Sequence, residues 1–258
     1  MQYYVVDAFA SEVFKGNPAG VCPMDGPADA ALMQKIAFEN NLAETAFFYP
    51  EGGGYRLRWF TPVNEVDLCG HATLASAYVV MRFIDPGANA VRFHTQSGLL
   101  TVTKDGEDLA MDFPSRKPVP CAVPEGLEEA LGVTAPQTFL SRDLLILLGS
   151  EAAVLAVKPD YKKLSQITGP LGFIVTAEGD VHDFVSRFFA PNAGIDEDPV
   201  TGSSHATLIP FWSERLKKSE MTAAQLSRRG GVLRCEDKGD RVLIAGKAVC
   251  YLRGEILL

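Results

Sequence analysis

The sequence has no long apolar stretch. Its longest apolar runs, such as Ala77 to Met81 and Leu144 to Leu148, fall far short of the roughly 20 residues that cross a bilayer. Met1 to Ala10 shows no basic segment leading into an apolar core, so no export signal is visible. The sequence therefore predicts a cytoplasmic protein with neither a membrane span nor a secretion signal.

Positive charge is scarce and scattered. The formal net charge is -8 at pH 7, and the Lys and Arg residues form no run or stripe that could neutralise phosphates. We therefore expect neither nucleic acid nor an anionic membrane as a partner.

Paired metal-ligand motifs are also missing. The cysteines are odd in number and widely spaced, without a C-x-x-C pair, and the histidines form no H-E-x-x-H pattern. This usage is typical of a reducing cytoplasm and predicts no bound metal. The residues concerned are Cys22, Cys69, Cys121, Cys235, Cys250, His71, His94, His182 and His205.

What the chain does contain is apolar surface and an internal repeat. Hydrophobic residues make up 47% of 258, enough for a full core. The segment Arg58 to Pro62 is echoed by Arg187 to Pro191, and His71 to Leu74 is echoed by His205 to Leu208, in the same order. Two related halves explain this order better than chance recurrence of short motifs.

Each half is expected to be an α+β unit. The proline-rich segment Pro114 to Pro124 disfavours both a helix and a central strand, so we place the join there, with halves 1–116 and 117–258. The sequence leaves open whether the last strand, 248–258, packs on the first half. The strongest predicted helices are Gln34 to Asn40, Gly70 to Phe83, Gly126 to Leu131, Tyr161 to Thr168 and Gly202 to Leu216, and the remaining alternating segments are predicted strands.

Two of these helix starts are candidate anion-binding sites. Small residues at the start of a helix let a ligand approach backbone N–H groups that have no helical partner, with the positive end of the helix dipole behind them. The alternative is ordinary capping by Thr201 and Ser203. The candidate substrate-binding residues are Gly70, Ala72 and Thr73 in the first half, and Gly202, Ser203 and Ser204 in the second.

Three titratable residues are candidates for proton chemistry. Glu44 precedes an apolar strand, and burial there would raise its pKa toward neutrality, as suits a group that both takes and gives a proton. Asp198 and His71 lie in the two repeated loops, where they could orient a substrate or share its proton. Each also has a plain structural alternative, since Asp before Pro commonly shapes a turn.

Five motifs together resemble the phenazine biosynthesis (PhzF-like) family over almost the whole chain. They are Val6-Asp7-Ala8-Phe9, Gly16-Asn17-Pro18, Glu44-Thr45-Ala46-Phe47, Gly70-His71-Ala72-Thr73 and Asp198-Pro199-Val200-Thr201-Gly202-Ser203. The chain departs from the family pattern at Ala43, where serine is frequent, and at Ser204, where alanine is common. These departures put the substrate in doubt more than the class of reaction.

The resemblance implies the fold of diaminopimelate epimerase, with two pseudo-symmetric domains, each a mixed β-sheet wrapped around a central helix. It further implies an active site in the cleft between the domains, a homodimer, and an isomerase that uses neither a metal nor an organic cofactor. In such an enzyme one glutamate moves a proton between carbons of a small carboxylate-bearing substrate. By resemblance Glu44 has this role, assisted by His71, Asp198 and Ser203.

Two other functions stay open from sequence. A two-thiol epimerase or racemase would exchange the α-proton between cysteines on opposite faces, and Cys69 is suitably placed, although the second loop has no cysteine. A binding protein could keep the fold and perform no chemistry.

Overall fold

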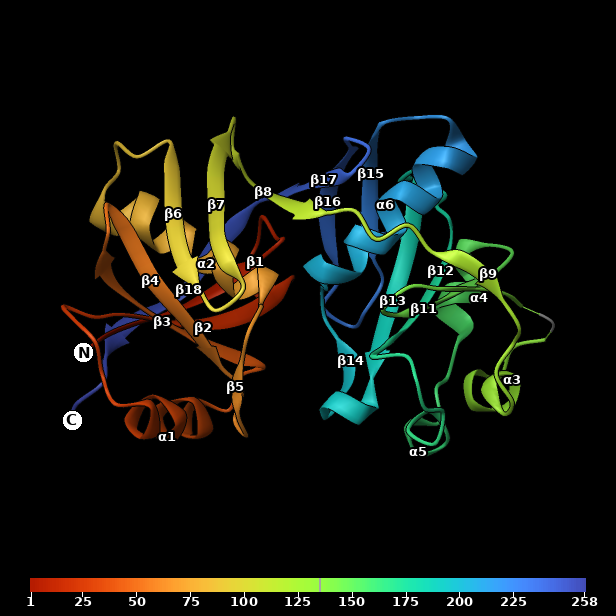
Figure 1. Ribbon diagram of the computed structural model, residues 1–258, viewed down its shortest axis with the longest axis horizontal. Coiled ribbons are helices and arrows are strands. Elements are labelled where there is room, and N and C mark those ends of the chain that lie inside the picture. The colour runs from red at the N-terminus through yellow and green to blue at the C-terminus, as the bar shows by residue number, and fades with distance from the viewer. Residues whose placement is uncertain (135) are drawn as a thin grey trace. The chain divides into compact units, whose positions relative to one another are not determined.

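The computed structural model describes residues 1–134 and 136–258 and divides the chain into two compact units (Figure 1). The first unit comprises Met1–Asp112 and Ala245–Leu258, and the second comprises Phe113–Ile244. Both units are sheet-dominated and α+β, the class predicted from sequence. No helix in the described ranges is long and apolar enough to cross a membrane.

The first unit is a mixed sheet with two helices. Its sheet order is β18, β1, β2, β3, β4, β6, β7, β8, with parallel pairing at β2–β3 and β4–β6 and antiparallel pairing elsewhere; β5 pairs with β4. The strands are β1 (Gln2–Ala8), β2 (Asn17–Pro23), β3 (Glu44–Glu51), β4 (Gly54–Phe60), β5 (Glu65–Val66), β6 (Ala90–Thr95), β7 (Gly98–Asp105), β8 (Asp108–Pro114) and β18 (Ala248–Glu255). The helices are α1 (Ala30–Asn40) and α2 (Gly70–Val79), and a π-helical segment η1 (Val80–Ile84) follows α2.

The second unit has the same plan. Its paired strands run β9, β10, β11, β12, β13, β15, β16, with parallel pairing at β11–β12 and β13–β15, and β14 pairs with β13. The strands are β9 (Val119–Cys121), β10 (Gln137–Leu140), β11 (Leu144–Leu147), β12 (Phe173–Glu178), β13 (Phe184–Ala190), β14 (Ile195–Asp198), β15 (Glu220–Gln225), β16 (Gly231–Asp237) and β17 (Arg241–Gly246). The helices are α3 (Leu127–Leu131), α4 (Glu151–Ala156), α5 (Tyr161–Leu164), η2 (Pro191–Ala193) and α6 (Gly202–Leu216).

The repeated sequence motif performs the same structural task in both units. Arg58 on β4 forms a two-pronged ion pair with Glu65 on β5, and its guanidinium lies 5.2 Å from the Phe60 ring centroid. Arg187 on β13 pairs in the same way with Glu197 on β14. Planar guanidinium and carboxylate groups fit each other in this geometry, so each pair fixes a short strand that leads to the central helix.

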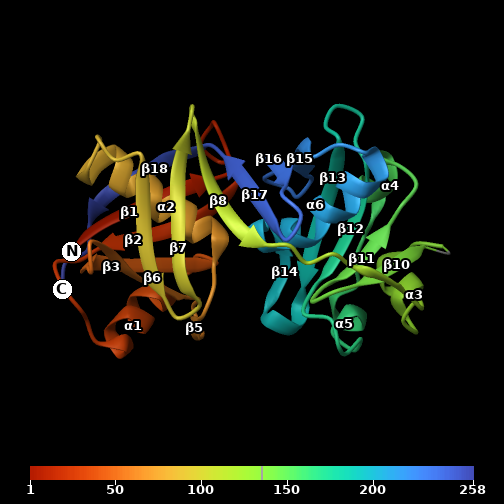
Figure 2. The ribbon, with the colours of Figure 1, turned by 45° about the horizontal axis from the view of Figure 1, so that its top comes forward.

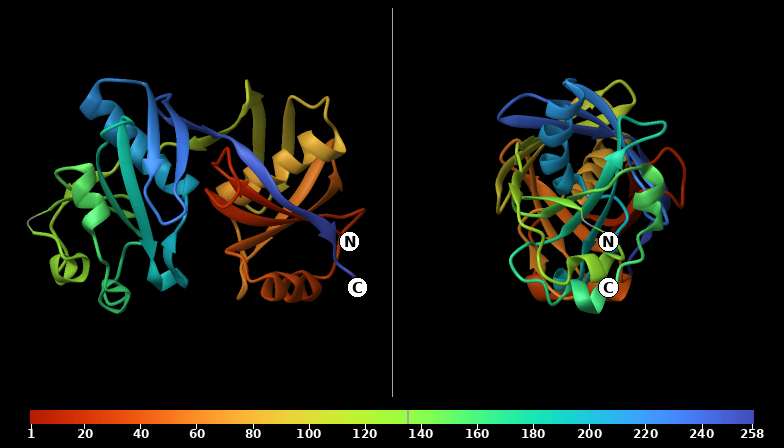
Figure 3. Two further views of the ribbon diagram at one scale, coloured as in Figure 1. Left: turned by 180° about the vertical axis from the view of Figure 1, so that it is seen from behind. Right: turned by 90° about the vertical axis from the view of Figure 1, so that its right-hand side faces the viewer.

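Helix α2 is the core of the first unit, and the strands curve around it (Figure 2). Nearly all of its side chains are buried, as expected for a helix that is apolar on every side. Helix α1 covers the opposite face of the sheet, where Met33 packs with Phe47 and Phe60. The terminal strand β18 runs antiparallel to β1, and the amino group of Met1 donates to the carbonyl of Ile256 at 2.8 Å (Figure 3).

Helix α6 has the central place in the second unit. Trp212 stacks on Phe184 of β13 at a centroid distance of 5.8 Å, while α3, α4 and α5 contribute to the core that covers the other face. Pro210 lies inside α6 and has no N–H to donate to the carbonyl of Ala206. The backbone N–H of Arg116 donates to that carbonyl instead, at 2.9 Å, so the proline is tolerated.

Two predicted helix limits were wrong, and a third helix changes type before its predicted end. The helix expected at 34–40 begins at Ala30, because Asp29 caps it through a bond from the Ala31 N–H. The helix expected at 70–83 changes to π-helical geometry at Val80. The helix expected at 161–168 ends at Leu164, ahead of a turn that leads to Gly169 at φ 110°.

Candidate functional site

A tight loop places Asn17 at the start of β2. Gly16 before it has φ 64°, and a Cβ there would lie 2.2 Å from the carbonyl oxygen of Ala8, so only glycine fits. The carboxylate of Asp7 accepts the Phe14 N–H at 2.9 Å and so ties the loop to β1. The Asn17 side chain is thereby held under the start of α2, fully buried.

His71, in the first turn of α2, lies between three polar groups. Its Nδ1 is 3.3 Å from the amide nitrogen of Asn17 and 3.5 Å from Sγ of Cys69. Its Nε2 is 3.3 Å from Oε2 of Glu44. Burial lowers the pKa of His71 to about 3, so the ring is neutral near pH 7.

This arrangement selects a tautomer. The amide nitrogen of Asn17 can only donate, so Nδ1 of His71 accepts and the ring proton sits on Nε2, facing Glu44. Nε2 of His71 and Oε2 of Glu44 lie 3.3 Å apart, but their geometry does not meet the angles of a hydrogen bond. Catalytic contacts of this kind commonly tighten when a substrate binds.

Glu44 opens β3 and is 8% exposed. Its neighbours on the strand, Thr45 to Phe48, are all buried, so the carboxyl group lies at the edge of an apolar core. Glu44, Cys69 and His71 also have donor atoms within 4.8 Å of one another, a spacing that could hold a metal ion. The first unit thus brings together two of the three predicted catalytic residues.

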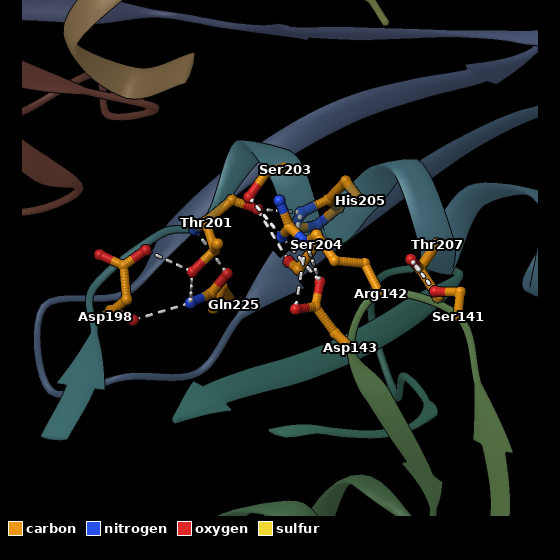
Figure 4. A network of polar contacts seen from close by, with 10 residues as sticks. All are labelled: Ser141, Arg142, Asp143, Asp198, Thr201, Ser203, Ser204, His205, Thr207 and Gln225. Atoms are coloured by element: carbon orange, nitrogen blue, oxygen red, sulfur yellow. Dashed lines mark hydrogen bonds and ion pairs between the residues drawn. The ribbon is translucent and has the colours of Figure 1, made fainter. Parts of the chain in front are cut away.

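Asp198, the third, ends β14 in the second unit (Figure 4). Its carboxylate accepts the hydroxyl proton of Thr201 at 2.5 Å, and its backbone carbonyl accepts from the Gln225 side chain at 2.8 Å. Gln225 in turn accepts the Thr201 N–H at 2.8 Å. These bonds hold the Asp198 carboxylate just ahead of α6.

The predicted binding residues begin the two central helices. Cys69 before α2 and Thr201 before α6, both in the described part of the chain, make no side-chain cap bond. The hydroxyls of Thr73 and Ser204 donate backwards to the carbonyls of Cys69 and Thr201, at 2.6 and 2.8 Å.

Ser203 makes a different contact. Its Oγ accepts from the guanidinium of Arg142 at 3.1 Å, and Arg142 also forms a two-pronged pair with the fully buried carboxylate of Asp143 (Figure 4). Gly202 precedes Ser203 as the first residue of α6, and Gly70 and Ala72 lie buried in the first turn of α2.

The repeated His-Ala-Thr-Leu motif is offset in the structure. His71 is the second residue of α2, whereas His205 is the fourth residue of α6. Ser203 therefore takes the helix position of His71, and Nδ1 of His205 lies inside the helix, 2.8 Å from the carbonyl of Thr201. Burial lowers the pKa of His205 to about 4. Thr201 has the place of Cys69, so no thiol stands there.

Sequence reasoning missed Asn17, Arg142 and Gln225 as parts of these clusters. In the sequence Asn17 stands out only as part of the motif Gly16-Asn17-Pro18, and Gln225 carries no local signal. Arg142 did carry one: the pair Arg142-Asp143 interrupts the apolar run from Phe139 to Leu148. Charged residues inside an apolar run are rarely buried without a partner.

A family model, a curated relative and a solved structure all match this chain over nearly its whole length. The family model for phenazine biosynthesis-like proteins matches residues 6–254. An uncharacterized isomerase of Pseudomonas aeruginosa is 49% identical over 255 residues, covering 99% of this chain and 98% of the relative. The crystal structure of a PhzF family protein from Enterococcus faecalis has a TM-score of 0.98 at 48% identity, covering 100% of this chain and 99% of that one.

A more distant solved structure shows how widely this fold is used. A Pseudomonas aeruginosa protein described as a predicted epimerase superposes with a TM-score of 0.76 at 21% identity, over 100% of this chain and 99% of that one. At this identity the likeness concerns the fold alone, which is that of the epimerase-like proteins.

Proposed function

The chain belongs to the phenazine biosynthesis-like family and is an isomerase, and from that premise we propose that it shifts a carbon-bound proton on a small carboxylate-bearing metabolite. Glu44 is the proposed general acid and base. The observation that carries the proposal is the buried contact series from Asn17 through neutral His71 to Glu44.

The proton balance of the proposed reaction needs one carboxylate. Glu44 removes a proton from a substrate carbon, and the electron pair of that C–H bond moves into the system conjugated with the substrate carboxylate. Glu44 then gives a proton to a different carbon on the same face, and exchange of the Glu44 proton with solvent between the two steps brings solvent hydrogen into the product. His71 stays neutral and directs its Nε2 proton toward Glu44, which favours the ionised form that can accept a proton.

The developing negative charge needs donors that are already in place. The start of α2, with Gly70, Ala72 and Thr73, and the start of α6, with Gly202, Ser203 and Ser204, offer helix N-termini for this purpose. We propose that these helix starts hold the negative charge of the substrate, and that Asp198 orients it. Replacing Ser203 by alanine should then raise KM more than it lowers kcat.

The test is hydrogen exchange. The protein is incubated with a metabolite mixture in deuterated water, and deuterium uptake at carbon is followed by mass spectrometry. Glu44→Gln should lower exchange by at least roughly 10²-fold, the usual range for loss of a general acid and base. Glu39→Gln, an equal charge change at an exposed position of α1, is the control. Undiminished exchange in the Glu44 variant would remove the proposal.

We also propose a homodimer in a reducing compartment. The family resemblance motivates the dimer, and the odd number of widely spaced cysteines without a C-x-x-C pair motivates the reducing compartment. Light scattering of the purified protein gives the mass: a value near 27.9 kDa would contradict the dimer.

A further inference from the structure

Two arginines lie against the first turns of α6. Arg116 is tied there by its backbone bond to Ala206, and Arg142 by its side-chain bond to Ser203. Arg142 precedes β11, which pairs in parallel with β12 as β2 pairs with β3 in the first unit. The segment containing Arg142 thus has the place in the second unit that the segment containing Asn17 has in the first.

The charges in this cluster do not cancel. The side chains of Arg116, Arg142 and Asp143 carry two positive charges and one negative charge, and the fully buried Asp143 forms its ion pair with Arg142. Burial, and then repulsion by Arg142, lower the pKa of Arg116. In the described part of the chain, Nη1 of Arg116 is buried and has no hydrogen-bond partner, a costly condition that an anionic ligand would relieve.

From this geometry we infer that Arg142 and Arg116 form a carboxylate-binding subsite beside Ser203. Nε and Nη2 of Arg142 are already bonded to Asp143 and Ser203, so a ligand carboxylate would accept from Nη1 of Arg142 and from Arg116, and the N-terminus of α6 adds favourable potential for negative charge. The inference rests on the proposed function, because the carboxylate it binds is that of the isomerised substrate.

The experiment titrates the full-length protein with malonate and, separately, with inorganic phosphate, by isothermal calorimetry. We expect malonate to bind the unaltered protein. Arg142→Lys keeps a cation beside Asp143 but loses the Nη1 donors that remain for a ligand, and should weaken malonate binding roughly tenfold. Arg116→Gln should weaken it by a similar factor. Lys117→Gln is the control. It removes the same charge at the residue next to Arg116, where the Lys117 side chain is 60% exposed.

Equal malonate affinity in the Arg142, Arg116 and Lys117 variants would overturn the inference, as would failure of malonate to bind the unaltered protein. Tighter binding of phosphate than of malonate would overturn the assignment to a carboxylate. Circular dichroism identifies a variant that fails to fold, in which case the other arginine variant decides. The titrations need no turnover, so malonate binding without exchange would refute the proposed function and leave the subsite intact.

Discussion

Replacing Thr201 by valine removes the hydroxyl that connects Asp198 with Gln225 and leaves a side chain of the same shape. The lost bond, from Thr201 Oγ1 to the Asp198 carboxylate, measures 2.5 Å and joins residues that are 7% and 8% exposed. Hydrogen bonds to charged groups contribute roughly 1.5–3 kcal/mol. The contact from Gln225 to the same hydroxyl, at 3.2 Å, adds little, because Nε2 of Gln225 keeps the Asp198 carbonyl. We expect a loss of about 2 kcal/mol.

Fluorescence can measure this change in the second unit alone. The chain has one buried tryptophan in each unit, Trp59 and Trp212. In a Trp59→Phe background, urea unfolding followed at Trp212 reports the second unit. Thr168→Val, at an exposed position of that unit, is the control and should change stability by less than about 0.5 kcal/mol.

The reasoning fails if Thr201→Val and Thr168→Val have equal stability, because the bond to Asp198 would then contribute nothing. A loss above about 4 kcal/mol would also contradict it, since that size indicates a cavity or a wider rearrangement. Because Asp198 is a proposed orienting residue, the variant should also lower deuterium exchange while Thr168→Val leaves it unchanged.

Three further predictions follow from the buried groups. Burial lowers the pKa of His205 to about 4, whereas an unfolded histidine has a pKa of about 6.5. The stability that His205 contributes above pH 6.5 is therefore lost on acidification, and the free energy of unfolding should fall by about 2 kcal/mol between pH 7 and pH 5. Urea unfolding at both pH values should show a smaller fall for His205→Gln. Gly16→Ala should cost the first unit roughly 2 kcal/mol or more, because of its positive φ and the clash with Ala8, whereas Gly87→Ala should not. Cys69→Ala should keep exchange within about tenfold, since a one-base mechanism needs no thiol; complete loss would favour the two-thiol alternative.

The central helices illustrate what local pattern can predict. Gly202–Leu216 is the helix expected from sequence, because its small-residue start and apolar periodicity are encoded within fifteen neighbouring residues. The weaker helices differ from the prediction where a cap or a change of helix type decided their limits. Asp29 added a turn to α1, and π-helical geometry replaced the last turn expected after α2.

By itself the sequence determined the fold class, the repeat, the family and the candidate residues, because each is carried by composition, periodicity or short motifs. Only the tertiary structure decided which side chains meet. Asn17 reaches His71 across 54 residues, and Arg142 reaches Ser203 across 61. Such contacts depend on strand register, which no local pattern contains. The same register placed Ser203, and not His205, in the helix position that matches His71.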